Sequence, residues 1–589
     1  MNQNHAETLT QHAMLVVWGQ FAQSISLIDK LQSIALQQKT MTHSPQRKVL
    51  EFLIAMLSGL EHLQDLSRSA HPIDQDQAVA KAWGQSGWAD YSGVSRTLAS
   101  LTQVEGEQIA AVLEQIGRPI LAEEIMLALQ RSGRLTYDGD LTGRPVASTS
   151  TTYPGVAYGH MGDGLQLGYQ AAMVSLHSPT YGRSWLSVTP HPGDTVSCTQ
   201  AEAMIRAAEA KTGLRPWRRT DLLRERIGSL EDECQKCHAK AQQSQEALEQ
   251  AQARLTETQQ QYDEQQALLL QLEAHYRERQ RPERPYSALA KARQRLSMLE
   301  RRRGRLEQKL PKLEKQLRHR QQRWLVPQAE FHRLQQRLVQ FEEQNRTNLC
   351  PIQADFRLDA GFGTRENVAL VIEMGYELYT KPHRNWLTPR LKRRLKKPTQ
   401  WTQVGKNAEM VAWNGERFSG FPYPLDVALE RFHTGQTQRH ATLLHFGSDP
   451  VTSDLPGWFH RYNARQLIEA GIKEGKNVFA MHHLKVRSAP ALFLQEQFAV
   501  FAANFVRWAA RWLTQQCPQI PSGWQYSACP KVKEQVKVGA HTSAWVDWQD
   551  QGCLLTFTDH SLFAGRSLAV KKQWVVQLPL PLSENAHFR

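Results

Sequence analysis

Hydrophobic positions in the N-terminal quarter of the chain repeat with the three- and four-residue spacing of amphipathic helices. The run SPQRKVLEFLIAMLSGLEHLQDLSR, residues 44–68, has this spacing, and Ser44 followed by Pro45 is a typical helix start. Further along, GWADYSGVSRTLASLT, residues 87–102, predicts a short helix, a turn and a second helix that opens near Ser92. This pattern fits a DNA-binding helix-turn-helix and a plain helical bundle equally well.

From residue 134 the pattern changes to strands. The segments RLTYDGDLTGRPVA, GLQLGYQAAMVSLHS and RSWLSVTPHPG predict three strands, and QAEAMIRAAEAKTG predicts a helix after them. Strand-like sequence resumes at CPIQADFRLD, followed by a Gly-rich turn, a helix from about Arg365 and the strand YELYTK. Strands that alternate with helices predict the α/β fold class.

A long helical segment separates these two groups of strands. From residue 221 to 346, Leu recurs at near-heptad spacing among Gln, Glu, Arg and Lys. The sequence RQRPERPYS, residues 279–287, breaks this run near its middle. We therefore expect an inserted antiparallel coiled-coil hairpin whose two helices have about 60 residues and a length of about 90 Å. Pro311 and Pro327 predict a kink or an interruption in the returning helix.

The hairpin has two alternative roles. A scaffold or dimer contact is the simplest. The basic clusters RERQRPERP at its tip and RRRGR at residues 301–305 make contact with DNA the second interpretation.

A basic segment and further strands follow the second strand group. Between Lys381 and Lys397 the chain has eight Lys or Arg and no acid, which predicts contact with phosphates, with a solvated loop as the alternative. Residues 409–433 and 440–448 are rich in strand signals, and residues 491–513 predict a strongly apolar helix. The tail from about residue 516 predicts strands and includes QWVVQLPLPL, residues 573–582.

These changes of pattern divide the chain into seven parts. They are an N-terminal helical DNA-binding domain (1–130), three parts of a catalytic core (131–217, 347–381 and 451–515), the coiled-coil hairpin (218–346), a basic β-rich insertion (382–450) and a C-terminal β-rich region (516–589). A length of 589 residues also favours several domains over one.

Composition favours a polyanionic partner. The chain has 71 Lys and Arg against 57 Asp and Glu, a net charge of +14. It has no pattern typical of a signal peptide and no run of 18 apolar residues, so we expect no membrane span. Seven cysteines at irregular spacing predict reduced thiols, and the Cys234–Cys237 pair has no second pair beside it that would complete a zinc site.

Acidic residues occur at the ends of predicted strands and on one short predicted helix. Asp138 and Asp140 lie on the first strand, and Asp359 ends a later one. The helix is RYNARQLIEAGIKEGK, residues 461–476. At about 100° per residue, Tyr462, Arg465, Glu469 and Lys476 share one stripe of this helix. Carboxylates on rigid elements are the ligands that two Mg²⁺ ions need for phosphodiester chemistry.

These segments resemble the DDE transposases of bacterial insertion sequences, in the group with a Y-x2-R-x3-E-x6-K signature. Tyr462, Arg465, Glu469 and Lys476 match that spacing without a gap. RLDAGFGTRENVALVIEMGYELYTK resembles the family's second-Asp segment, and YDGDLTG its first-Asp segment. The resemblance covers about 150 residues. It implies an RNase H-like core, while the N-terminal helices match loosely and the hairpin departs from the common pattern.

The resemblance implies that Asp140, Asp359 and Glu469 are the catalytic residues and hold two Mg²⁺ ions, for which Mn²⁺ would substitute. Asp138 is the alternative to Asp140, which is preferred because Thr142 stands two residues beyond it. Asp355 is a weaker candidate than Asp359, and Glu474 lies off the stripe.

The resemblance also implies residues that bind DNA. From the signature these are Tyr462, Arg465 and Lys476. The charge of the basic segment, apart from the resemblance, adds Arg390, Lys392, Arg393, Arg394, Lys396 and Lys397. Trp386, Trp401 and Trp413 are candidates for stacking on an unpaired base, with core packing as the alternative.

The function implied is cut-and-paste transposition in the bacterial cytoplasm, in association with the nucleoid. The partners are double-stranded DNA, both element ends and target, and a second copy of the chain on paired ends. Two rival interpretations are a catalytically silent DNA-bridging coiled-coil protein and a metal-dependent nuclease without strand transfer.

Overall fold

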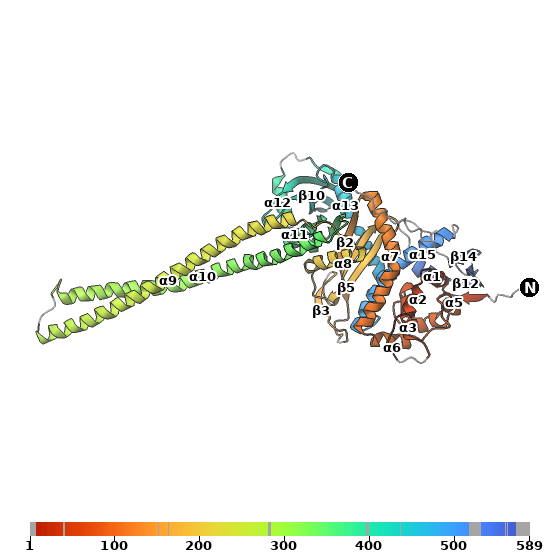
Figure 1. Ribbon diagram of the computed structural model, residues 1–589, viewed down its shortest axis with the longest axis horizontal. Helices are drawn as coiled ribbons and strands as arrows, with labels where there is room; N and C mark the ends of the chain where they lie inside the picture. The colour runs from red at the N-terminus through yellow and green to blue at the C-terminus, as the bar shows by residue number, and fades with distance from the viewer. Residues whose placement is uncertain are drawn as a thin grey trace, which may run out of the picture. The chain divides into compact units, whose positions relative to one another are not determined.

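The computed structural model describes residues 7–38, 42–150, 152–162, 164–280, 284–395, 400–435, 437–483, 485–516, 532–559, 561 and 564–572. The chain forms two compact units. The first contains residues 1–217 and 350–589, and the second is residues 218–349. Elements of both units are labelled in Figure 1.

The N-terminal region is helical apart from one short strand. Strand β1 (Thr8–Thr10) precedes the helices α1 (Ala13–Ser24), α2 (Leu27–Gln32), α3 (Pro45–Leu57), α4 (Asp65–Arg68), α5 (Gln77–Ala82), α6 (Tyr91–Ser100) and α7 (Gln103–Ser132), with a 3₁₀ turn, η1 (Ile73–Gln75). The predicted start of α3 is confirmed, because the Ser44 side chain accepts a hydrogen bond from Arg47 N. The short helix predicted near residue 87 is wrong: α6 alone is helical there, and Asp90 caps it.

A ten-stranded mixed sheet organises the first unit. Its strands are β2 (Arg134–Pro145), β3 (Ala157–Met161), β4 (Gly164–Ser178), β5 (Gly182–Pro192), β6 (Gln353–Leu358), β7 (Glu377–Thr380), β8 (Thr402–Gly405), β9 (Ala408–Glu416), β10 (Leu425–Thr434) and β11 (Thr437–Phe446). Their order is β3-β4-β2-β6-β7-β11-β10-β9-β8, and β5 pairs with β4. The pairs β2–β6 and β6–β7 are parallel, and the other pairs are antiparallel.

The sequence predicts most of these strands because their residues are buried and lie between clear turn signals. The α/β class is confirmed, and so is a strand-rich segment between residues 382 and 450, where β8–β11 extend the sheet beyond β7. Two 3₁₀ turns, η2 (Ser197–Thr199) and η3 (Ala360–Phe362), and the helices α8 (Ala201–Thr212), α11 (Arg365–Glu373) and α12 (Leu387–Arg394) connect the strands.

Side chains alternate across β2, and this decides which of its residues face the candidate site. A Cβ atom at Gly139 would lie 2.6 Å from Met204 Cε of α8, so position 139 faces α8. Successive side chains of a strand point to opposite faces. Asp138 and Asp140 therefore point to the other face, where α14 packs.

The predicted helix at residues 461–476 is wrong as a single element. The chain forms α13 (Leu455–Asn463) and α14 (Gln466–Val478), with Ala464 and Arg465 in a turn between them. Both turn residues keep right-handed helical dihedral angles. Tyr462 is thus on α13, whereas Glu469 and Lys476 are on α14.

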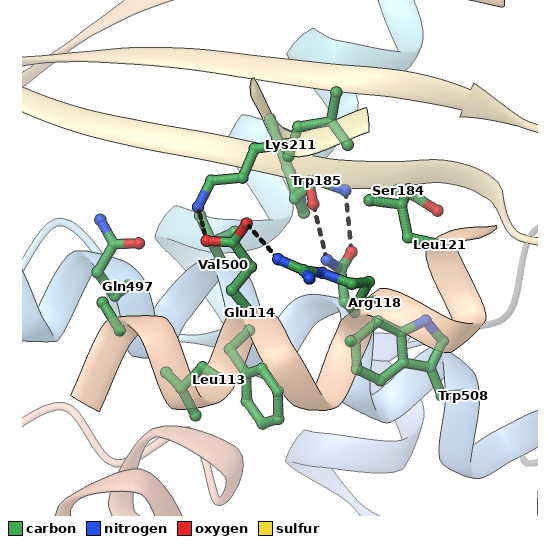
Figure 2. Close-up of a pocket in the computed structure, with 15 residues that line it drawn as sticks. Leu113, Glu114, Arg118, Leu121, Ser184, Trp185, Lys211, Gln497, Val500 and Trp508 are labelled. Carbon is green, nitrogen blue, oxygen red and sulfur yellow. Dashed lines mark hydrogen bonds and ion pairs between the residues drawn. The ribbon is translucent and has the colours of Figure 1, made fainter. Parts of the chain in front are cut away.

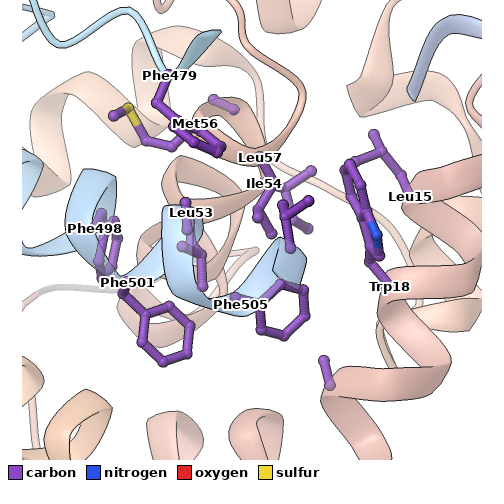
Figure 3. Packing of buried hydrophobic residues seen from close by; sticks show 14 of the residues in the cluster. Leu15, Trp18, Leu53, Ile54, Met56, Leu57, Phe479, Phe498, Phe501 and Phe505 are labelled. Carbon is purple, nitrogen blue, oxygen red and sulfur yellow. The ribbon is translucent and has the colours of Figure 1, made fainter. Parts of the chain in front are cut away.

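Helix α15 (Ala489–Gln516) lies at the centre of the core of the first unit. Figure 3 shows Phe498, Phe501 and Phe505 of this helix among side chains of α1 and α3. The same core includes side chains of α16 (Val532–Lys537) and of a second sheet, β1-β12-β13-β14. The last three strands are β12 (Ala544–Gln549), β13 (Gly552–Phe557) and β14 (Ser567–Lys571), and the 3₁₀ turn η5 (Gly539–His541) precedes them. Residues 573–582 lie outside the described residues.

The second unit is the predicted hairpin. Its helices α9 (Thr220–Glu278) and α10 (Ala288–Arg346) have 59 residues each and run side by side (Figure 1). The expected interruption at Pro311 and Pro327 is wrong, because both prolines lie inside α10, which is continuous. In the described part of the chain, no helix has the length and apolarity that a membrane span requires.

Candidate active site

The carboxylates that the sequence singles out lie on neighbouring elements of the first unit, near Arg465, although their ligand atoms do not all lie within 4.8 Å of one another. Asp140 is on β2, and Asp359 follows the neighbouring parallel strand β6. Glu469 is in the first turn of α14, and the Arg465 guanidinium forms an ion pair with it. Arg465 Nη1 also lies 3.6 Å from Asp140 Oδ2. One largely buried arginine, with 11% of its side chain exposed, therefore connects carboxylates from two elements far apart in sequence.

The electrostatics of the site follow from the burial of Asp140 and Asp359 near few cations, while the Glu469 side chain is partly exposed. The pKa of Asp140 is raised to about 7, chiefly by burial and also by the nearby Asp359 and Glu469 carboxylates, against the opposing charge of Arg465. Burial also raises the pKa of Asp359, again against the effect of Arg465. The backbone amides of Gly361 and Phe362 favour the charged form of Asp359. Even so, its buried Oδ1 makes no hydrogen bond of good geometry with the described residues.

This donor set fits a hard divalent cation. The three side chains offer only carboxylate oxygens, which Mg²⁺ and Mn²⁺ prefer. Mutual repulsion among buried carboxylates is relieved by a bound cation, and an unpartnered buried oxygen is available on Asp359. Asp140, Asp359 and Glu469 could therefore hold the metal.

Asp138 has a different environment from Asp140, although both point to the same face. Its two carboxylate oxygens accept hydrogen bonds of 2.6 Å from Arg357 Nε and Nη2, and both side chains are buried. Arg357 also donates to the backbone oxygen of Arg461, at 3.0 Å. Asp138 thus holds β2, β6 and α13 together, and its oxygens face an arginine instead of the other carboxylates.

The remaining signature residues surround the carboxylates. Tyr462 is buried, and burial raises its pKa to about 12. Burial lowers the pKa of Lys476; the charge of Arg144 lowers it further, while Asp140 opposes them.

Lys381 also reaches the site, although the sequence identified it only as the start of a basic run. Its Nζ lies 5.2 Å from the centre of the Tyr462 ring. Burial lowers its pKa, and the buried Glu430 of β10 opposes this. The one sequence signal that could have placed Lys381 near the carboxylates is its position directly after β7, because β7 lies next to β6 and Asp359.

Contacts on the far side of α14 hold the helix in place. Glu474 accepts hydrogen bonds of 2.8 and 2.9 Å from Arg507 of α15 and lies 3.4 Å from Arg183 of β5. Arg183 also donates to the backbone oxygen of Leu467. A Cβ atom at Gly471 would lie 2.2 Å from Arg183 Cζ, so a glycine is needed for this contact.

The basic residues of the insertion lie on an exposed helix. Arg390, Lys392, Arg393 and Arg394 are exposed on α12, and Arg394 pairs with Glu416 at 2.8 Å. Lys396 and Lys397 lie outside the described residues.

The three tryptophans of the insertion contact other residues of the same region. Trp386 stacks on Phe421, with ring centres 6.1 Å apart. Arg431 lies 4.1 Å from the centre of the Trp401 ring, and Arg394 lies 6.0 Å from that of Trp413. These contacts agree with packing roles, and each ring is only partly buried.

A second group of possible metal ligands, Glu377, His445 and Asp449, is already compensated by arginine. Their ligand atoms lie within 4.8 Å of one another. However, Arg134 Nη1 lies 2.9 Å from Glu377 and 3.1 Å from Asp449, and Arg461 pairs with Asp449 as well. Arg134 also binds Asp355, at 3.0 Å, so Asp355 belongs to this network. We assign the network a structural role between β2, β6 and β7.

A cavity of about 90 Å³ lies apart from the carboxylates, between α7, β5 and α15 (Figure 2). Glu114 of α7 pairs there with Lys211, and Asn504 exchanges hydrogen bonds of 3.0 and 2.9 Å with the Trp185 backbone. These polar groups are engaged with each other. We therefore interpret the cavity as a packing gap, and the contacts around it hold α15 against the sheet.

No protein-family model matches the chain, and no curated protein sequence matches it.

Proposed function

We propose that the protein is a DNA transposase of the DDE type, which cleaves DNA at the ends of an insertion sequence and joins the 3′-hydroxyl ends to target DNA. The observation that carries the proposal is the convergence of Asp140, Asp359 and Glu469 around Arg465. The order β5-β4-β2-β6-β7, in which β4 alone runs antiparallel to its neighbours' common direction, supports an RNase H-like core.

The metal would be held by the three carboxylates. Two Mg²⁺ ions supply a nucleophile from water or a 3′-hydroxyl and stabilise the leaving oxygen. The protein's own groups hold the DNA: Arg465, Lys476 and Lys381 supply positive charge beside the carboxylates, and the Tyr462 hydroxyl can donate to a phosphate. Arg465 would pass from the carboxylates to the phosphate when metal binds.

The rest of the duplex would lie on the basic helix α12. Its exposed Arg390, Lys392 and Arg393 are suited to phosphate contacts, which position DNA without reading its sequence. Binding of element ends would pair two copies of the chain. The N-terminal helices are the proposed site for recognising those ends.

The test is metal-dependent cleavage of a plasmid that carries the inverted repeats flanking the coding sequence. Asp359→Asn and Glu469→Gln should lower Mg²⁺-dependent nicking by about 100-fold or more, because each removes a metal ligand, while end binding in a gel shift survives. Asp232→Asn, an exposed acid on α9, is the matched control and should cleave normally. Cleavage at the normal rate by either site variant would contradict the proposal.

The same assay separates the two rivals. A DNA-bridging protein would bind and never nick in Mg²⁺. A nuclease without strand transfer would nick but give no joined products on sequencing gels, so detection of joined products decides in favour of transposition.

A further inference from the structure

The two helices of the hairpin carry opposite charge. Helix α9 has twelve Asp and Glu against six Lys and Arg, whereas α10 has sixteen Lys and Arg against six Glu. Some of these charges pair between the helices, as Arg293 of α10 does with Glu273 of α9, at 2.8 Å. These pairs do not account for all the cations of α10. What the remaining cations can contact depends on where they lie on the helix surface.

Five exposed cations of α10 form one stripe, whereas Arg302, Lys315 and Arg318 are exposed outside it. At about 100° per residue, the five lie within about 80° of one another around the helix axis. We call these five residues the basic stripe: Arg301, Arg305, Lys309, Lys312 and Arg323. All five are exposed, and none forms an ion pair with a residue that the structure describes.

The rest of this part of α10 is arranged by kind as well. The leucines of the seam lie about 120–180° from Arg301 around the axis, and the acids lie about 100–140° away in the other direction. The leucines are Leu299, Leu306, Leu310, Leu313 and Leu317, and the acids are Glu300, Glu307 and Glu314. The basic stripe therefore faces solvent beside the leucine seam, with neither apolar nor acidic side chains within it.

This arrangement favours duplex DNA over other polyanions. The stripe runs over about 33 Å, which is close to the roughly 34 Å of one turn of duplex DNA. A membrane surface would require apolar side chains interspersed with the cations, whereas the exposed Met298 and Val326 lie beyond the two ends of the stripe. A single strand would require aromatic rings for its bases, and Trp324 lies on the seam side of the helix.

We propose that the outer face of α10 binds the phosphate backbone of duplex DNA through the basic stripe, as a contact surface separate from the candidate active site. The hairpin then extends the DNA-binding surface of the protein. This binding needs neither metal nor cleavage, so it does not depend on the proposed function.

The experiment compares two quadruple variants of the full chain that lose equal charge. R301Q/R305Q/K309Q/K312Q removes four cations of the stripe, and K236Q/K240Q/R254Q/R277Q removes four from α9. Glutamine keeps the helix propensity close to that of the replaced residues. Binding of a 30-base-pair duplex is measured in EDTA by fluorescence anisotropy over a series of salt concentrations.

The stripe variant should bind at least about tenfold more weakly at 0.1 M salt, and its log–log salt slope should fall by about 3 to 4. The α9 variant should stay within about twofold of the unchanged protein. R301K/R305K should keep the affinity, because the stripe makes backbone contacts and not base contacts. Circular dichroism should show equal helix content in all of them.

Three results would overturn the proposal. They are equal weakening by both quadruple variants, unchanged affinity of the stripe variant, and loss of binding to single-stranded DNA or phosphatidylglycerol vesicles with duplex affinity retained. Absence of nicking in the unchanged protein would refute the transposase and leave this binding result intact.

Discussion

At the scale of residues, the two aspartates of β2 show how neighbours with the same orientation take different roles. Asp138 and Asp140 are both on the face that α14 covers. Arg357 takes both oxygens of Asp138, while Asp140 shares Arg465 with Glu469. Which of the two is the candidate metal ligand depends on the arginine that each contacts. The spacing of residues in the sequence does not predict that contact.

Asp138→Asn should therefore lower the stability of the folded protein. It leaves the Arg357 guanidinium buried without its charge partner, and breaking such a pair costs about 3–5 kcal/mol. The expected result is a clear fall in the urea concentration at the unfolding midpoint. Mg²⁺ binding, measured by calorimetry on protein that remains folded, should change little, whereas Asp140→Asn should weaken it strongly with a smaller loss of stability.

The buried Glu51 of α3 predicts a dependence of stability on pH. Burial raises its pKa from 4.5 to about 9. Its Oε2 accepts a hydrogen bond from Ala89 N at 3.1 Å. The folded protein thus keeps a proton that the unfolded chain releases above pH 4.5, so the contribution of Glu51 to stability is lost as the pH rises from about 4.5 to about 9.

Glu51→Gln should remove this loss, since glutamine resembles the protonated acid. Between pH 6 and pH 8.5 the midpoint of thermal unfolding should fall less in the variant than in the unchanged protein. At pH 8 the variant should be more stable, by about 1 kcal/mol or more. Parallel pH profiles for the two proteins would contradict the assignment.

At the scale of elements, α14 depends on a glycine that weakens it as an isolated helix. Gly471 costs about 1 kcal/mol of helix propensity relative to alanine. In return it lets Arg183 of β5 lie against the helix and donate to Leu467 O, beside its ion pair with Glu474. The position of Glu469 relative to β2 thus depends on packing against β5 and α15.

Gly471→Ala should consequently destabilise the first unit, by about 1–3 kcal/mol, because Arg183 must move. It should also lower Mg²⁺-dependent nicking through the displacement of Glu469. Gly106→Ala on α7 is the matched control, since a Cβ there would meet its nearest atom at an ordinary 3.6 Å. Unfolding midpoints and nicking rates of the two variants, measured together, check the prediction; equal behaviour would contradict it.

The continuity of α10 contradicts the interruption expected at its two prolines. Pro311 and Pro327 each remove a backbone donor and were expected to kink or interrupt the helix. Residues on both sides of the prolines pack against α9, among them Leu299, Leu317 and Leu334, which are buried. Packing along the whole seam offsets the local cost.

At the scale of the whole molecule, the hairpin is inserted where the chain leaves and re-enters the first unit at neighbouring points. Ile352 N donates to Arg215 O at 3.3 Å, so the two ends of the insertion are adjacent. The first unit has its own core around α15. Loss of the hairpin should therefore leave that core intact.

Replacement of residues 218–349 by about four Gly and Ser residues should give a folded protein whose first unit keeps its unfolding midpoint within a few degrees. Its helix content should fall by the share of α9 and α10. Circular dichroism and calorimetry check this, with the Asp138→Asn chain as a destabilised reference. Failure to fold would show that the units are not independent.

The sequence by itself determined the local features of this protein. Hydrophobic spacing gave α3, α9, α10 and α15, and turn residues bounded β4, β6 and β7, because these signals lie within one element. It also singled out Asp140, Asp359 and Glu469 by position and by resemblance. It did not give the break between α13 and α14, nor the pairing of β1 with β12, since both depend on contacts with distant segments.

Only the tertiary structure decided which charged groups meet. Arg357 pairs with Asp138, and Arg134 pairs with Glu377. Lys381 lies over the Tyr462 ring. Each of these pairs joins two different elements. Such pairing is fixed by the order of strands and by which helix covers which face. The paired residues are up to 243 positions apart in the sequence. Local pattern carries no information on it, because a buried charge takes its partner from whatever element the fold brings beside it.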